Sequence, residues 1–172
     1  MNPDLLLQWL AYAAPVCFAG LGGLISEKSG VVNIALEGQM LCGALAAAAA
    51  AALTGNPWLG ALAGALAGAA ASGLFAAFAV GLRRDQVIVG TTLNFLALGM
   101  TGVLARAMTK ANPKALSAPS LPHLAGALDP VSLGSLVLVP VLWWWIHRTR
   151  AGVALRATGE RPAAAAAGGF HV

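Results

Sequence analysis

Five apolar stretches, each long enough to cross a lipid bilayer, constrain most strongly what this chain can fold into. They cover approximately residues 5–25, 30–53, 57–80, 87–107 and 131–147. A membrane-spanning α-helix needs roughly 20 mostly apolar residues, with about 17 as the lower limit. Only 9% of the residues are charged, against about 25% in soluble domains, so lipid rather than water is the expected solvent. The sequence therefore predicts an all-α fold, a polytopic transmembrane helical bundle with about five spans.

The positions of the Lys and Arg residues predict how these spans are oriented. With the N-terminus outside, three cations face the exterior, namely Arg106, Lys110 and Lys114. The other seven face the cytoplasm: Lys28, Arg83, Arg84, Arg148, Arg150, Arg156 and Arg161. Because an excess of Lys and Arg marks the cytoplasmic side, we expect the C-terminus in the cytoplasm and the proline-rich loop at 108–130, with His123, outside. The cations form no basic face, so we expect no nucleic-acid partner.

The third stretch carries a small residue at every fourth position, Gly60, Gly64, Gly68 and Ser72. A continuous stripe of small side chains lets another helix approach closely, because dispersion rather than hydrophobicity drives helix association in lipid. We therefore predict a helix-packing face here. The alternative is an alanine-rich composition in which glycine is scattered by chance.

The second stretch contains polar side chains that are costly in lipid. Asn33 and Glu37 are four residues apart, so on a helix they would share a face. An acid at the bilayer centre costs about 2.5–3.5 kcal/mol on insertion scales, so Glu37 should face protein, water or a solute path. Gly30 and Gly38 flank the pair and weaken the helix, which predicts a discontinuous second span like those that line transporter pathways. Two interpretations stay open: hydrogen bonds that fix helix packing, or a lining for the route of a polar solute.

The segment after the fifth span predicts a short helix outside the membrane. Pro162 suits the first helical position, five alanines extend the helix, and Gly168 and Gly169 stop it. A helix this short is marginal in water, so we expect it to dock into a cleft on a partner. The alternative is a disordered basic tail.

Three segments carry a further signal. They read GLGGLISEKSGVVNIALEGQMLCGALAAA (20–48), LRRDQVIVGTTLNFLALGMTGVL (82–104) and RTRAGVALRATGERPAAAAAGGFHV (148–172). In this order, and over almost the whole chain, they resemble the permeases of ABC transporters of the sugar and nucleoside importer class. The form SGVVNIxLEG is closer to the nucleoside-type branch than to the sugar branch. We assign Asn33, Glu37 and, from the second segment, Asn94 to the substrate pathway that this resemblance implies.

The third segment resembles the cytoplasmic coupling segment of that family, typically R-A-x-G-E-N-P. Arg156, Gly159, Glu160 and Pro162 match this form, whereas Arg161 stands where the family has Asn. Asn is a good helix N-cap and Arg is not, so the departure bears on the docking geometry. The resemblance implies that these five residues couple the permease to an ATPase.

The resemblance also implies an assembly in the bacterial plasma (inner) membrane. Its other members would be an ABC ATPase subunit, a second permease subunit and an extracytoplasmic substrate-binding lipoprotein, with membrane lipid around the spans. The ATPase would bind ATP and Mg, and this chain would bind no cofactor. Residues 1–172 would form one transmembrane permease domain, incomplete at its C-terminus because family members continue with further spans. Its expected function is to translocate nucleosides or related polar solutes in an ABC importer.

Catalytic signatures are missing from the sequence. No G-x-x-x-x-G-K-[ST] phosphate loop, metal-ligand set or nucleophile–base pair can be assembled, so we expect a transport subunit and not an enzyme. Two alternatives stay open. A secondary transporter or channel-type membrane protein could use the same spans without needing residues 156–169, and an inactive permease fragment would insert but transport nothing.

Overall fold

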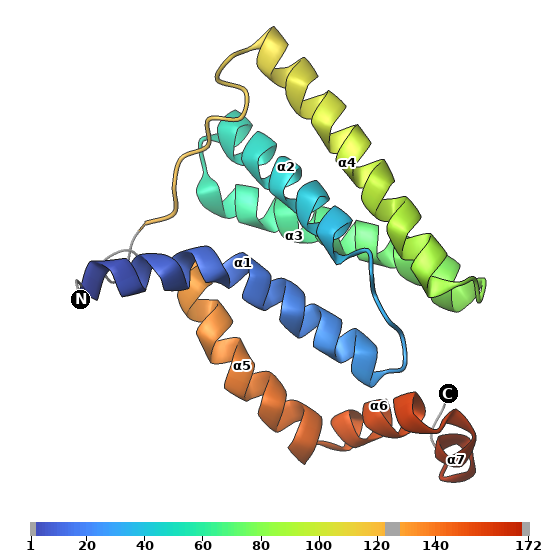
Figure 1. The fold of residues 1–172 in the computed structure, drawn as a ribbon. Helices are drawn as coiled ribbons and strands as arrows, with labels where there is room; N and C mark the ends of the chain where they lie inside the picture. Colours follow the sequence, from blue (N-terminus) through green and yellow to red (C-terminus); the bar gives the residue numbers. More distant parts are fainter. Residues whose placement is uncertain (1–2, 123–127, 170–172) are drawn as a thin grey trace. The chain divides into compact units, whose positions relative to one another are not determined.

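The computed structural model describes residues 3–122 and 128–169, and most of this part is helical (Figure 1). The elements are α1 Pro3–Lys28, α2 Leu36–Thr54, α3 Pro57–Ala76, the π-helical turn η1 Ala77–Gly81, α4 Gln86–Ala111, α5 Pro130–Arg148, α6 Arg150–Glu160 and α7 Pro162–Ala167. Within the described residues, five helices are long and apolar enough to span a membrane: Leu7–Lys28, Leu36–Thr54, Pro57–Gly81, Gln86–Ala111 and Pro130–Arg148. The predicted all-α fold with five spans is thus confirmed. His123 and residues 170–172 of the predicted coupling segment lie outside the described residues.

The helices form two compact units. One contains α1, α5, α6 and α7, from residues 1–32 and 122–172, and the other contains α2, α3, η1 and α4, from residues 33–121.

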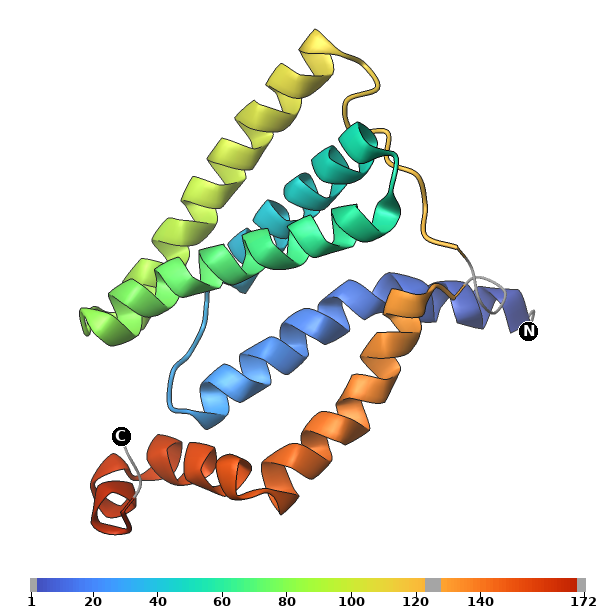
Figure 2. The same ribbon diagram turned by 180° about the vertical axis from the view of Figure 1, so that it is seen from behind.

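In the second unit, α2 and α3 lie side by side. The helix α4 lies along α2 but diverges from α3 away from the turn that joins the two (Figures 1 and 2). Polar caps begin α3 and α4 after short turns. Gly55 ends α2 in the left-handed conformation, with φ +68°, and Asn56 Oδ1 then accepts the Trp58 N–H at 2.9 Å to start α3. Asp85 Oδ1 likewise accepts the Val87 N–H at 2.8 Å to start α4. Such caps satisfy N–H groups that have no partner inside a helix.

The small-residue stripe of α3 lies against α2. A Cβ added at Gly60 would lie 2.6 Å from the Cβ of Ala51, and one at Gly64 would lie 2.9 Å from a Cβ one turn earlier in α2. At Gly68 the nearest atom would be 3.9 Å away, and Ser72 is half-buried. The two backbones therefore approach most closely at the start of α3, where no side chain fits.

In the first unit, α1 packs against α5 and α6, and α7 packs against α6. The Ser132 N–H donates to Asp129 Oδ1 at 2.6 Å, which caps the start of α5. Thr149 turns the chain from α5 into α6, because its hydroxyl donates to the Trp145 carbonyl at 2.7 Å and accepts the Gly152 N–H at 3.1 Å.

One prediction about a helix boundary is wrong, and one helix was not predicted. The second span was expected to be helical from about residue 30, but residues 29–35 are not helical and α2 begins at Leu36, then runs unbroken through Gly38. Residues 150–160 form α6, a helix outside the predicted elements. The helix α7 has the bounds expected from Pro162 and the alanines that follow.

Candidate functional site

The chain leaves α1 through a turn that only glycine accommodates easily. Gly30 has φ +86°, its N–H donates to the Glu27 carbonyl at 3.0 Å, and the Val31 N–H donates to the Ser26 carbonyl at 3.1 Å. These two bonds form a Schellman motif, the common helix ending with glycine in the left-handed conformation. The Ser26 hydroxyl also donates to the Val31 carbonyl at 2.8 Å. The peptide groups around Val31 are therefore fastened to the end of α1.

Asn33 lies in the non-helical segment before α2. Its Oδ1 accepts the Ala35 N–H at 3.0 Å, a turn in which the side chain replaces a backbone acceptor. Its amide also pairs with that of Gln39, with Asn33 Nδ2 to Gln39 Oε1 at 3.2 Å and Gln39 Nε2 to Asn33 Oδ1 at 3.3 Å. The prediction that Asn33 and Glu37 share a helical face is therefore wrong, because Asn33 precedes the helix and its hydrogen bonds go to backbone and to a buried glutamine.

Asn94 of α4 caps the start of α2 from a distant part of the sequence. Its Oδ1 accepts the Gly38 N–H at 2.7 Å, and its Nδ2 donates to the Ile34 carbonyl at 2.9 Å. The first N–H groups of a helix have no partner within the helix, and Ala35 at the N-cap provides no side-chain bond. Asn94 supplies that missing acceptor and simultaneously satisfies a carbonyl of the preceding segment. Gly90 lies one turn before Asn94 in α4, and its missing side chain leaves room for Ile34. The start of α2 can therefore approach α4 closely enough for these two hydrogen bonds.

Glu37 lies beside this cap but makes no hydrogen bond or ion pair with any described residue. Its side chain is exposed, and with four residues of α4 it lines a hollow of about 190 Å³: Thr91, Asn94, Phe95 and Leu98. The Thr91 hydroxyl already donates to carbonyls of its own helix. A carboxylate only accepts hydrogen bonds. The unpaired Glu37 carboxylate in this hollow therefore suits a ligand group that donates a hydrogen bond, such as a hydroxyl or an amine. The positive end of the α2 dipole also stabilises an acid at this position.

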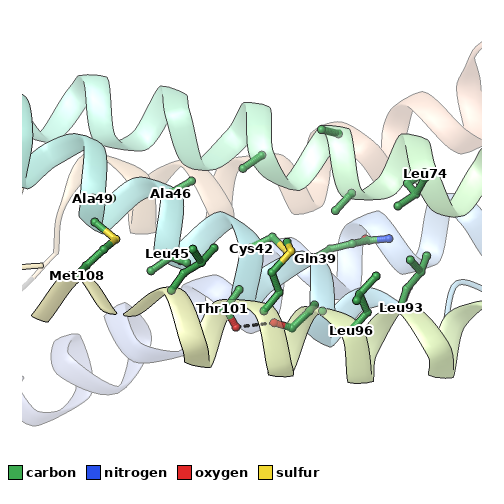
Figure 3. A pocket seen from close by; sticks show the side chains of 18 residues that line it. Gln39, Cys42, Leu45, Ala46, Ala49, Leu74, Leu93, Leu96, Thr101 and Met108 are labelled. Atoms are coloured by element: carbon green, nitrogen blue, oxygen red, sulfur yellow. Dashed lines mark hydrogen bonds between the residues drawn. The ribbon is translucent and has the colours of Figure 1, made fainter. Parts of the chain in front are cut away.

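A larger cavity, of about 650 Å³, lies between α2, α3 and α4 (Figure 3). Met108 lies at one end of it and Leu74 at the other, and its lining is almost wholly apolar. The polar side chains among the lining residues, Gln39 and Thr101, already bond to Asn33 and to the Ala97 carbonyl. This cavity offers apolar contact but few free polar groups, so its chemistry does not suit a polar solute.

The predicted coupling residues cover the end of α6 and the start of α7. Arg156 lies in α6, and its Nε is buried without a hydrogen-bond partner in the described part of the chain. The backbone of Gly159 contacts the backbone of the turn that ends α1. Glu160 and Arg161 are exposed, and Arg161 precedes α7 without a capping side-chain bond. Pro162 occupies the first turn of α7, a position that needs no N–H donor.

Two features of these sites were missed in the sequence. Gln39 was not singled out, although a buried amide in an apolar span needs a partner and could have been matched with Asn33. The helix α6 could have been predicted from Thr149, a good N-cap residue whose hydroxyl accepts the N–H of Gly152 three residues later. In the described residues, no group of three or more His, Cys, Asp or Glu side chains could hold a metal ion.

The structure thus defines a multi-pass membrane protein with a small polar cluster at the start of one span and two helices beyond the last. Comparison with known proteins then identifies the family. The family described as "Branched-chain amino acid transport system / permease component" matches residues 5–172, and this chain belongs to it.

Its curated relatives include transport permeases from bacteria and an archaeon. The chain is 35% identical to "Guanosine ABC transporter permease protein NupQ" of Bacillus subtilis (strain 168), over 95% of this chain and 58% of that protein. It is 31% identical to "Nucleoside ABC transporter permease protein NupC" of Lactococcus lactis subsp. cremoris (strain MG1363), over 98% and 59% of the two. It is 32% identical to "Putative glucose ABC transporter permease protein TsgC13" of Haloferax volcanii, over 91% and 52%. The chain therefore spans less than two thirds of the length of these relatives. No solved structure matches it.

Proposed function

We propose that this chain acts as a membrane permease subunit of an ABC importer that translocates nucleosides or related polar solutes. The observation that carries the proposal is the family match over residues 5–172, together with relatives whose names specify guanosine and nucleoside permeases. The chain itself would carry out no catalysis. Transport would follow alternating access, in which ATP-driven closure of a separate ATPase rocks the spans around the pathway.

Within this proposal, Glu37 lines the route of the solute. An exposed carboxylate in a span is costly in lipid unless protein, water or a ligand satisfies it, and its neighbours in the hollow leave it without a partner. Hydroxyl and amino groups of a nucleoside or sugar could donate to it. Asn33 and Asn94 contribute indirectly, because their amides hold the backbone on which Glu37 stands.

The driving reaction would belong to partners. We propose an ABC ATPase that binds ATP and Mg, a second permease subunit, and an extracytoplasmic substrate-binding lipoprotein that delivers the solute. Arg156, Gly159, Glu160, Arg161 and Pro162 would form the docking segment for the ATPase. A short alanine-rich helix such as α7 gains stability from packing against a partner.

The proposed location is the bacterial plasma (inner) membrane, with the N-terminus outside, the C-terminus in the cytoplasm and residues 1–172 in one permease domain. Seven of the ten Lys and Arg side chains then lie on the cytoplasmic side. The variant Lys114→Cys, in a Cys17→Ala, Cys42→Ala background, carries a single cysteine. This cysteine should react with an impermeant thiol reagent added outside intact cells. Reaction only after the cytoplasm is opened would reverse the orientation.

Gene deletion in the native organism tests the function. We expect uptake of labelled nucleosides to fall when the gene is deleted and to return when it is restored on a plasmid. Unlabelled guanosine, uridine and glucose added as competitors would define the solute class. Uptake that disappears with a protonophore while cellular ATP is maintained would favour a secondary transporter. Uptake of the labelled nucleosides that is unchanged by the deletion would favour an inactive fragment.

A further inference from the structure

The end of α6 touches the end of α1 through two glycines. A Cβ added at Gly159 would overlap the Lys28 carbonyl oxygen and lie 2.9 Å from the Gly30 nitrogen. A Cβ added at Gly30 would lie 3.2 Å from the Gly159 Cα. Contacts between Cβ and backbone below 3.0 Å force something to shift, so backbone meets backbone here and only glycine fits at position 159 without movement.

On one side of this contact, the chain passes almost immediately to the start of α2. Val31 is fastened to α1 by its N–H and its carbonyl, both bonded to Ser26. Asn33 is fastened to the start of α2 by its bonds to Ala35 and Gln39. Val32 alone separates these two anchored residues, so the connection has little slack.

On the other side, Gly159 lies three residues before Pro162, where α7 begins. Glu160 ends α6 and Arg161 is the joint between the two short helices. A displacement of α7 therefore acts on the end of α6 before it reaches any other element.

We propose that Gly159 is a positioning residue for transport. Its backbone contact with Gly30 passes movement of α6 and α7 to residues 31–35, and so to the start of α2 where Glu37 and the Asn94 cap lie. This inference rests on the proposed function, since it assumes that an ATPase moves α7.

Hydrogen exchange in the complete transporter, purified with its partner subunits, measures this movement directly. We expect Mg and a non-hydrolysable ATP analogue to change the exchange of the amides at 31–38 in the wild type. In Gly159→Ala, the change at 31–38 and the solute transported per ATP hydrolysed should be lost. Gly134→Ala in α5 is the matched control, because nothing lies within 4 Å of its added Cβ, and it should behave as the wild type.

A second variant introduces no clash, so it tests the inference even if Gly159→Ala does not fold. Two glycines inserted between Val32 and Asn33 leave both anchors intact and add slack, and they should abolish the same response. The same insertion between Ala118 and Pro119 should not. A normal response at 31–38 in both the Gly159 variant and the slack variant would overturn the inference and leave the proposed function standing. The absence of any co-purifying ATPase would instead overturn the proposed function, and this inference with it.

Discussion

Replacing Asn94 separates its two candidate roles, backbone cap and pathway lining. Asn94→Ala removes the acceptor of the Gly38 N–H and the donor to the Ile34 carbonyl. Gly38 is buried, and an unsatisfied buried donor costs about 1–3 kcal/mol. The Ile34 carbonyl adds a smaller cost because it is only half-buried. We therefore expect Asn94→Ala to destabilise the protein by about 2–4 kcal/mol.

Two further substitutions calibrate this figure. Asn94→Asp keeps an acceptor for the Gly38 N–H but sets an oxygen against the Ile34 carbonyl. It should therefore also destabilise, through the lost donor and the repulsion between the two oxygens. Thr92→Ala is the control on the same helix, because the exposed Thr92 hydroxyl donates only to the Ile88 carbonyl of α4 itself. That change should stay within about 0.5 kcal/mol of the wild type.

Thermal unfolding of the purified protein in detergent, paired with uptake measurements, is the assay. If Asn94 acts as a backbone cap, the melting temperature and the uptake should fall together in the Asn94 variants. If Asn94→Ala melts like Thr92→Ala and yet transports nothing, the side chain serves the solute directly and the reasoning from the cap is refuted.

Three other predictions follow from the structure. Gly60→Ala should lower the melting temperature, because its Cβ would lie 2.6 Å from a Cβ of α2. Gly68→Ala should raise or preserve the melting temperature, because the nearest atom would be 3.9 Å away. Equal shifts for the two variants would show that the stripe does not pack as described. Glu37→Gln should lower the stability only slightly, by the helix-dipole interaction of about 0.3–1 kcal/mol, because no described residue bonds to the carboxylate. It should reduce uptake roughly tenfold, or about 1.4 kcal/mol, and normal uptake would favour a packing role. The double variant Ala164→Gly, Ala165→Gly should lose about 1 kcal/mol of helix propensity at each position. It should abolish solute-stimulated ATP hydrolysis in the complete transporter. Full stimulation in this variant would show that α7 does not take part in coupling.

The elements that could be predicted from the sequence are those whose signals are local. Span length and apolar composition locate the five membrane helices found in the described residues. Pro162, the alanines and the glycines after them likewise define α7 within its own segment. The start of α2 was misplaced because Val31, Val32 and Ile34 extend the apolar stretch toward the N-terminus. Hydrogen bonds of Val31 and Asn33 that lie outside a helical pattern keep this segment non-helical.

The polar cluster could be predicted only in part, because its bonds join distant residues. Asn33 and Glu37 stand out in an apolar span, and the family resemblance adds Asn94. No local pattern indicates that Asn94 bonds to backbone groups 56 and 60 residues away. The sequence also identifies the glycine stripe of α3 but not its partner, which the contacts at Gly60 and Gly64 assign to α2.

Solute accumulation by the complete transporter in proteoliposomes tests the central claim most directly. The complex would be reconstituted with its substrate-binding protein on the external face, and labelled nucleoside would be followed with ATP and Mg supplied to the cytoplasmic face. The account predicts accumulation against a gradient that requires ATP hydrolysis and persists when a protonophore dissipates the proton gradient. Accumulation that follows an ion gradient and ignores ATP would contradict it.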